Sequence, residues 1–252
     1  MLQNKFLKIV GSVLCGAGLS ILLIFSGLWA CSLPVSTQLM AQQSAAADIS
    51  FYTEEELNSL AIIVRDFTFG EISQESMQKQ IDAIAQKYMP LVDPPVGGDL
   101  KINSEFNYEN LSMFLGSDAI SHLEDVAHFI TLSKIANVFA LGLFIAGLAI
   151  LLFTKDTNAI RYTLTVSSMA ILVILVLSGV YALIDFYSFF NLLHSLIFPA
   201  GSWLYPTDSL LISMYPLDFW MGMGLIWLAS TVLCCLLCLG TSLVIRLKTH
   251  AK

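Results

Sequence analysis

Charged side chains are scarce in this sequence. Only 12% of its 252 residues are Asp, Glu, Lys or Arg, whereas 56% are hydrophobic. An ordinary soluble domain carries about 25% charged residues. The composition therefore excludes a typical soluble domain and identifies an integral membrane protein.

Basic residues are fewer than acidic ones, and the net charge is −7. Most of the acidic residues lie in one segment, 31–131. Nucleic-acid binding requires a clustered basic surface. The charge balance therefore gives no support to a nucleic-acid partner.

Common catalytic and metal-binding motifs are missing as well. The chain contains neither G-x-S-x-G, which marks a serine nucleophile elbow, nor the zinc motif H-E-x-x-H. Four of its five cysteines fall inside apolar runs, where cysteine behaves as a small apolar residue, and their spacing matches no zinc site. They are Cys15, Cys234, Cys235 and Cys238. We therefore predict no metal and no cofactor.

Cys31 has two interpretations. It follows a basic stretch, an apolar run and Leu28-Trp29-Ala30, as the lipidated cysteine of a lipoprotein signal does. However, the apolar run is long enough to span a membrane, and Trp29 suits an interfacial anchor.

Four apolar segments are long enough to be membrane-spanning helices, which need about 20 residues. They are 9–29, 132–153, 162–184 and 219–245. The third and fourth contain no charged residue. The predicted fold class is an all-α integral membrane protein with four transmembrane helices in a single membrane domain.

Basic residues near the predicted spans alternate in position. They precede the first span, separate the second from the third and follow the fourth: Lys5, Lys8, Lys155, Arg161, Arg246, Lys248 and Lys252. The positive-inside rule then places both termini in the cytoplasm. The insertion 31–131 and the loop 185–220 consequently face outward.

The outer insertion shows helical periodicity. Thr53-Glu54-Glu55-Glu56 predicts a capping box that opens one helix. Apolar residues at three- and four-residue spacing predict a second helix, from about Met77 to before Pro90, and Ser117-Asp118 predicts the start of a helix that runs into the second span. Between them, Pro94, Pro95, Gly97 and Gly98 predict an irregular connection, and Gln42–Asp48 a polar hinge after the first span.

Two histidines are the main candidate catalytic residues. His194 lies in an aromatic loop that is expected at the level of the lipid headgroups. His122 lies at the start of the second span, three residues before Asp125 and on the same helical face. His128 points about 120° away from His122 on that helix. The topology places His122 and His194 on one outer surface, where two imidazoles suit acid and base catalysis.

Two other classes remain open. A zinc-dependent membrane lipid hydrolase would use His122, Asp125, His194 and Asp208 as ligands. A non-catalytic membrane scaffold is the second alternative. A transporter is disfavoured, because it would carry ionisable groups deep in the membrane.

Two motifs resemble the lipoprotein intramolecular transacylases of Gram-positive bacteria. The segment His122-Leu123-Glu124-Asp125-Val126-Ala127 is similar to the family's His-Met-x-Asp-Val-Lys, although Leu123 and Ala127 depart from it. The second motif is an aromatic loop around one histidine: Asp185-Phe186, Phe190, His194, Phe198, Trp203, Asp208-x-Leu210, Tyr215-Pro216 and Phe219-Trp220.

The resemblance implies an acyltransferase that needs no cofactor. It would move the sn-2 acyl chain of a lipoprotein's diacylglyceryl-cysteine to the α-amino group of the same cysteine. Its partners would be diacylglyceryl-modified lipoproteins and membrane lipid. One of His122 and His194 would remove the amine proton and the other would protonate the departing glyceryl oxygen. Either assignment is open, and Asp125, which could orient His122, favours His122 as the base. Supporting residues are Tyr205, as an oxyanion donor, Asp185 and Asp208, while Phe190, Phe198, Trp203 and Trp220 would hold acyl chains.

Overall fold

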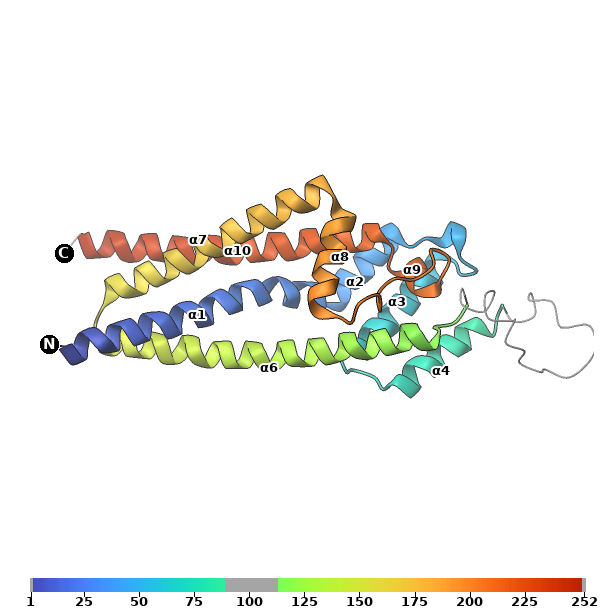
Figure 1. Ribbon diagram of the computed structural model, residues 1–252, viewed down its shortest axis with the longest axis horizontal. Coiled ribbons are helices and arrows are strands. Elements are labelled where there is room, and N and C mark those ends of the chain that lie inside the picture. The colour runs from blue at the N-terminus through green and yellow to red at the C-terminus, as the bar shows by residue number, and fades with distance from the viewer. Residues whose placement is uncertain (1, 89–112, 251–252) are drawn as a thin grey trace, which may run out of the picture. The chain divides into compact units, whose positions relative to one another are not determined.

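The computed structural model describes residues 2–88 and 113–250, and over these ranges it is helical and contains no strand. Four of its helices are long and apolar enough to cross a membrane, as the sequence predicted. Figure 1 shows them as α1 (Leu2–Ser32), α6 (Ser117–Phe153), α7 (Thr157–Ile184) and α10 (Leu217–His250). The connection predicted from Pro94, Pro95, Gly97 and Gly98 lies outside the described residues.

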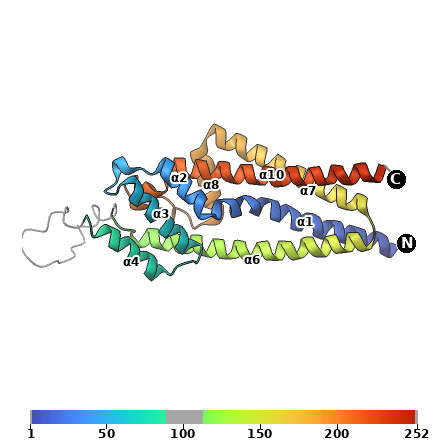
Figure 2. The ribbon, with the colours of Figure 1, turned by 180° about the vertical axis from the view of Figure 1, so that it is seen from behind.

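The chain divides into two compact units. We call Met1–Cys31, Leu132–Phe189 and Gly224–Lys252 the spanning unit. Ser32–Thr131 and Phe190–Met223 form the histidine unit. In the spanning unit, α1 begins and α10 ends at the same end, as Figure 2 also shows.

Helix α6 is longer than one membrane crossing. Its 37 residues correspond to about 55 Å at 1.5 Å per residue, against a hydrocarbon thickness of about 30 Å. Its first part carries ionisable side chains, including Asp118, Glu124 and Asp125, and belongs to the histidine unit. The part of α6 that belongs to the spanning unit begins at Leu132.

Glycines bring α1 and α6 into backbone contact within the spanning unit. A Cβ atom added to Gly147 would lie 2.2 Å from the nitrogen of Cys15 and 2.6 Å from the oxygen of Gly11. One added to Gly18 would lie 2.5 Å from the oxygen of Ala140. Such close approach is how helices associate in lipid, where the hydrophobic effect gives little drive for helices to pack.

Polar contacts complete the spanning unit. Ser167 of α7 donates to the Gly16 carbonyl of α1 over 3.2 Å, and the hydroxyls of Thr165 and Ser242 lie 2.7 Å apart. At the connection between α6 and α7, Asp156 caps α7 and forms a 2.8 Å ion pair with Lys8 of α1.

The histidine unit is built from shorter helices around an apolar core. They are α2 (Pro34–Ser44), the 3-10 turn η1 (Ala47–Ile49), α3 (Glu54–Thr68), α4 (Gln74–Ala85), the start of α6, most of α8 (Phe186–Ile197) and α9 (Leu210–Met214). The predicted capping box is present: the Thr53 hydroxyl accepts from the Glu56 nitrogen, and the Glu56 carboxylate accepts from the Thr53 nitrogen. The second predicted helix is present as α4, although it begins at Gln74, before Met77; its Met77 and Ile81 are fully buried.

Three elements of this unit were not predicted. Helix α2 starts at Pro34, which suits the first turn because it needs no free N–H, so part of the predicted hinge 42–48 is helical. Helices α8 and α9 lie within the predicted loop 185–220. Asp185 caps α8, because its carboxylate accepts from the Ser188 nitrogen over 3.0 Å.

A buried arginine ties α3 to the end of α1. Arg65 donates two hydrogen bonds, of 3.2 and 2.7 Å, to the carbonyl of Ser32. Its other branch pairs with Asp66 at 2.7 Å and Glu71 at 2.6 Å. The guanidinium thus donates to the carbonyl of the last residue of α1, one of the groups at a helix end for which a side chain commonly supplies a partner.

Candidate functional site

His122 and His194 lie in the same unit and share an aromatic neighbour. His122 stands on the first part of α6, and its ring centre is 4.9 Å from that of Phe198. The His194 ring, on α8, is 5.6 Å from the same phenyl ring. Phe198 is the first residue after α8. The segment that carries His194 therefore also supplies the phenyl ring that contacts His122.

The hydrogen bonding of His194 defines which of its nitrogens can take a proton. Its Nδ1 lies 2.9 Å from the carbonyl oxygen of Phe190, one turn earlier. A carbonyl only accepts, so Nδ1 carries the hydrogen in the neutral ring and Nε2 keeps its lone pair. Burial lowers the pKa of His194, and the bond to Phe190 opposes this change. His194 therefore presents an unprotonated Nε2 near neutral pH.

His122 is more deeply enclosed, with 8% of its surface exposed. Its Nδ1 is buried and has no hydrogen-bond partner among the described residues. The ring is therefore not held by an Nδ1 hydrogen bond to Asp125, as we had expected from the spacing. Burial and the nearby charge of His194 together lower the pKa of His122 to about 4, although the Asp125 carboxylate opposes both effects. His122 is a neutral ring at neutral pH.

Aromatic side chains surround His194. The Phe190 ring stacks on it with centres 3.8 Å apart. The rings of Trp203 and Trp220 lie at 5.8 and 6.2 Å. All four residues expected to hold acyl chains, with Phe198 as the fourth, thus lie around this imidazole.

Asn191 is a site residue that the sequence analysis missed. Its side-chain oxygen accepts a 2.9 Å hydrogen bond from the indole nitrogen of Trp203. It stands three residues before His194 in α8, on the side of the helix that is half-buried. Helical spacing from His194 was the signal that could have identified it.

Tyr205 lies beside the pair, with its ring centre 6.1 Å from that of His122. Its hydroxyl donates to the Ser202 carbonyl over 2.6 Å and also lies 3.2 Å from the carbonyl oxygen of Asp118. Burial and the nearby charges of Asp118 and Asp125 raise its pKa to about 12. The phenol is thus a neutral donor whose proton is engaged by the backbone.

The two remaining predicted supporting residues, Asp185 and Asp208, are exposed, as is His128. Asp185 serves as the cap of α8. Within residues 2–88 and 113–250, no group of three His, Cys, Asp or Glu side chains could hold a metal ion. The four-ligand set considered for a zinc hydrolase is therefore not assembled.

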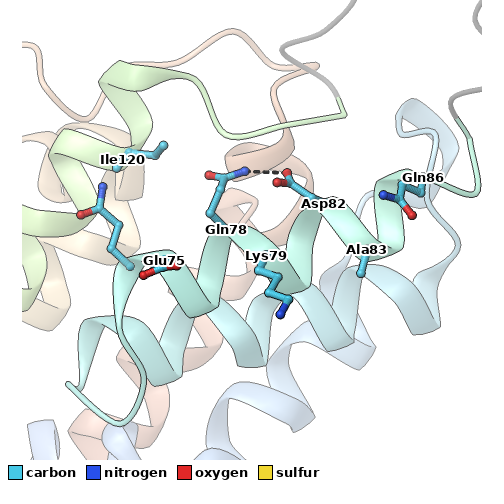
Figure 3. A pocket seen from close by; sticks show the side chains of 8 residues that line it. Glu75, Gln78, Lys79, Asp82, Ala83, Gln86 and Ile120 are labelled. Atoms are coloured by element: carbon cyan, nitrogen blue, oxygen red, sulfur yellow. Dashed lines mark hydrogen bonds between the residues drawn. The ribbon is translucent and has the colours of Figure 1, made fainter.

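A separate hollow of about 750 Å³ lies along α4 (Figure 3). Polar side chains of one face of this helix line it, and Gln78 donates to Asp82 across 2.8 Å. Ile120 of α6 also contributes. His122, two residues later, lies about 200° around the helix from Ile120. The hollow is thus distinct from the histidine pair.

Fold and site together define a class of protein: a multi-pass helical membrane protein in which two imidazoles, uncharged near neutral pH, lie in an aromatic cluster. The family model for the lipoprotein intramolecular transacylase Lit matches residues 20–220. The chain therefore belongs to this family, and it is a lipoprotein-modifying acyltransferase.

Solved structures agree with this fold. The chain is similar to the membrane-integral lipoprotein intramolecular transacylase Lit from Bacillus cereus, with a TM-score of 0.65, 13% identity and coverage of 99% of both chains. Two further structures of that protein, in which one histidine is replaced by arginine or by alanine, match with TM-scores of 0.63 and 13% identity. They cover 99% of this chain and 94% and 96% of theirs. No curated protein sequence matches the chain.

Proposed function

We propose that the chain transfers the sn-2 acyl group of a diacylglyceryl-cysteine to the α-amino group of that cysteine, with His122 and His194 moving and holding protons. The product is an N-acyl, S-monoacylglyceryl lipoprotein. The observation that carries the proposal is that two neutral imidazoles contact the same phenyl ring, that of Phe198. In one of them, His194, Nδ1 is hydrogen-bonded to a backbone carbonyl. Because the amine and the ester belong to one molecule, the site has to hold a near-attack geometry and needs no nucleophile of its own.

His194 acts as the base in this proposal. As the amine nitrogen attacks the ester carbonyl, its proton passes to Nε2 of His194, the nitrogen that the Phe190 bond leaves free. When the bond from the carbonyl carbon to the glyceryl oxygen breaks, His194 returns the proton to that oxygen. One histidine serves as base and then as acid in the same way in the serine proteases. Atoms and charge balance without a cofactor.

His122 acts as a donor to the developing oxyanion. A buried N–H without an acceptor costs more than an unsatisfied lone pair, so the unpartnered Nδ1 of His122 favours the ring form with hydrogen on Nε2. A positive charge on His194 lowers the pKa of His122, so His122 stays neutral while His194 holds the proton. This assignment differs from the one that the sequence favoured, because His194 now serves as both base and acid and His122 as neither.

The proposed orientation places both termini in the cytoplasm and the histidine unit outside. The ion pair of Lys8 with Asp156 supports it, because these residues then share one side of the membrane with Lys155 and Arg161. The acyl transfer then takes place at the outer leaflet. Diacylglyceryl-lipoproteins would reach the site within that leaflet.

Mass spectrometry of a lipoprotein's N-terminal peptide tests the proposal. The chain is expressed in a strain whose lipoproteins carry diacylglyceryl-cysteine with a free amine. We expect an acylated amine and one fewer O-acyl chain, at unchanged total mass. His194→Ala and His122→Ala should each abolish most conversion, whereas His128→Ala, an exposed residue on the helix of His122, should not.

Three outcomes would contradict the proposal or a part of it. A peptide that loses one acyl chain and keeps a free amine would indicate a lipid hydrolase, and its dependence on metal could be measured with a chelator. A peptide that stays unchanged in the presence of the folded protein would refute acyl transfer altogether. Full conversion by both histidine variants would refute the site assignment only.

A further inference from the structure

Helix α8 has two sides with different surroundings. One side carries Phe190, Asn191 and His194, which are half-buried against the aromatic cluster. Much of the remaining circumference carries aliphatic side chains that are exposed. Their exposed fractions are 45% for Leu192, 42% for Leu193, 74% for Leu196 and 43% for Ile197. We call these four residues the outer face of α8.

The place of α8 in the chain indicates what covers its outer face. Helix α7, which is long and apolar enough to cross a membrane, ends at Ile184. Its last residues, Leu183 and Ile184, are 89% and 78% exposed, as expected of side chains in contact with lipid. A single residue, Asp185, separates them from α8. In the chain, the outer face of α8 thus follows closely after a helix end whose exposed side chains suit contact with acyl chains.

Length and composition determine how such a helix meets the membrane. Helix α8 has 12 residues, or about 18 Å, and cannot cross about 30 Å of hydrocarbon. Histidine 194 is its only ionisable side chain apart from Tyr187. A short amphipathic helix of this kind lies in the plane of the interface with its apolar face among the acyl chains.

We propose that α8 is an in-plane helix of the outer leaflet and that membrane lipid covers Leu192, Leu193, Leu196 and Ile197. His194, on the half-buried side of the helix, then stands at the depth of lipid ester groups. This step rests on the proposed function: a diacylglyceryl substrate would reach the histidines sideways from the leaflet, with its acyl chains remaining beside α8.

Fluorescence quenching by lipid-borne nitroxides tests the location of the outer face. Leu196→Cys is made in a variant without the five native cysteines, labelled with an environment-sensitive fluorophore and reconstituted in phosphatidylcholine vesicles. The vesicles carry a nitroxide at acyl carbon 5 or carbon 12. We expect strong quenching, greater with carbon 5 than with carbon 12. The control is Lys79→Cys, an exposed polar position on α4, which we expect to be quenched by aqueous iodide instead.

A second measurement uses the native cysteines and sequence, in case the substituted chain does not fold. Phospholipids with a diazirine near the ester end of the acyl chain are photoactivated in vesicles that contain the unmodified protein. We expect adducts on the peptide that includes Leu192–Ile197 and none on α4. Adducts confined to the spans, or a Leu196 label that iodide reaches as easily as the Lys79 label, would overturn the proposal. A Leu196 label that is protected from both quenchers would indicate a second protein copy on this face and overturn it as well.

These readouts do not depend on catalysis. A chain that fails to transfer acyl groups yet shows the expected quenching would refute the proposed function and keep the location of α8. A chain that transfers acyl groups without quenching at Leu196 would do the reverse. His194→Ala should be labelled like the parent protein.

Discussion

The spanning unit and the histidine unit bury their side chains in different ways. In the spanning unit, α1 and α6 touch through Gly11, Gly18 and Gly147, and many large aliphatic side chains are exposed. In the histidine unit, large side chains such as Leu57 and Met77 are fully buried. Lipid tails are as apolar as a leucine side chain, so burying leucine between helices in lipid stabilises a protein little. For side chains that would otherwise face water, the same burial is the main force that drives folding.

The difference bears on catalysis, because both histidines belong to the unit with the dense apolar core. Leu123, the neighbour of His122, is part of that core, and so is Phe219, the neighbour of Trp220. Side chains packed in this way hold a narrow range of positions. A reaction that depends on near-attack geometry benefits from such a support.

The largest expected effect on activity comes from removing either imidazole of the pair. His122→Ala and His194→Ala should each lower the rate of acyl transfer by about 10² to 10⁴, the usual range for acid and base groups. The double variant should be no worse than the poorer single variant, because residues that act as a unit are not additive. Rates come from the time course of N-acylated peptide. Multiplying losses would show that the two rings act independently.

Removal of the buried guanidinium should destabilise the histidine unit. Arg65→Met takes away the two hydrogen bonds to the carbonyl of Ser32 and the ion pairs with Asp66 and Glu71. Because the side chains of Asp66 and Glu71 are 28% and 52% exposed, most of the loss comes from the hydrogen bonds of the charged donor and amounts to about 1.5–3 kcal/mol. The free energy of unfolding in detergent measures the loss, with exposed Lys79→Met as the control. Equal stability of the two variants would show that Arg65 has no anchoring role.

Local signals explain how much of this architecture the sequence could predict. The Thr53–Glu56 box and the four apolar runs need only neighbouring residues to be recognised, and the structure confirms both. Helix α8 was missed because it lies inside an aromatic segment that was interpreted as a single loop. Its cap also depends on the conformation of Asp185, which the sequence does not show. Sequence spacing also favoured Asp125 as the partner of His122.

The details of the histidine pair depend on contacts that no spacing rule contains. Phe198, which contacts His122, stands 76 positions after it in the chain. The lack of a hydrogen-bond partner for Nδ1 of His122 likewise depends on which side chains pack around the ring. The proposed protonation roles follow from these contacts, so the sequence, with its family resemblance, could identify the two histidines but not the role of each.

Acid should destabilise the histidine unit through His122. Its pKa is about 4 in the folded protein, below about 6.5 in an unfolded chain. The unfolded state thus binds more protons between these values, so the free energy of unfolding falls as pH decreases from about 6.5 to 4 and then levels off. His122→Gln should lack this part of the decrease, which amounts to at most about 3 kcal/mol. Parallel pH curves for the two proteins would contradict the lowered pKa.

The close contact between α1 and α6 predicts that a substitution at Gly147 lowers the stability of the spanning unit. Gly147→Ala would place a methyl group against the backbone of α1, at distances that force the helices to shift. Overpacking of this kind costs about 1–3 kcal/mol. Gly142→Ala on the same helix is a matched control, because no atom lies within 4 Å of its added Cβ. Thermal unfolding should separate the two variants, and a Gly147→Ala protein as stable as Gly142→Ala would show that the helices do not meet there.

The smallest effect concerns the helix cap of α3. Thr53→Ala removes the hydroxyl that accepts from the Glu56 nitrogen over 3.3 Å, at a cost of about 1 kcal/mol. The loss stays this small because Glu56 still accepts from the Thr53 backbone position and from Lys87 and Tyr88. Those bonds, which outweigh the opposing effect of burial, lower the pKa of Glu56 to about 2. Ser59→Ala, in the exposed middle of α3, should cost nothing, because alanine favours helix and water replaces the hydroxyl. If chemical unfolding finds the two variants equally stable, the cap contributes nothing, and the core alone holds α3 in place.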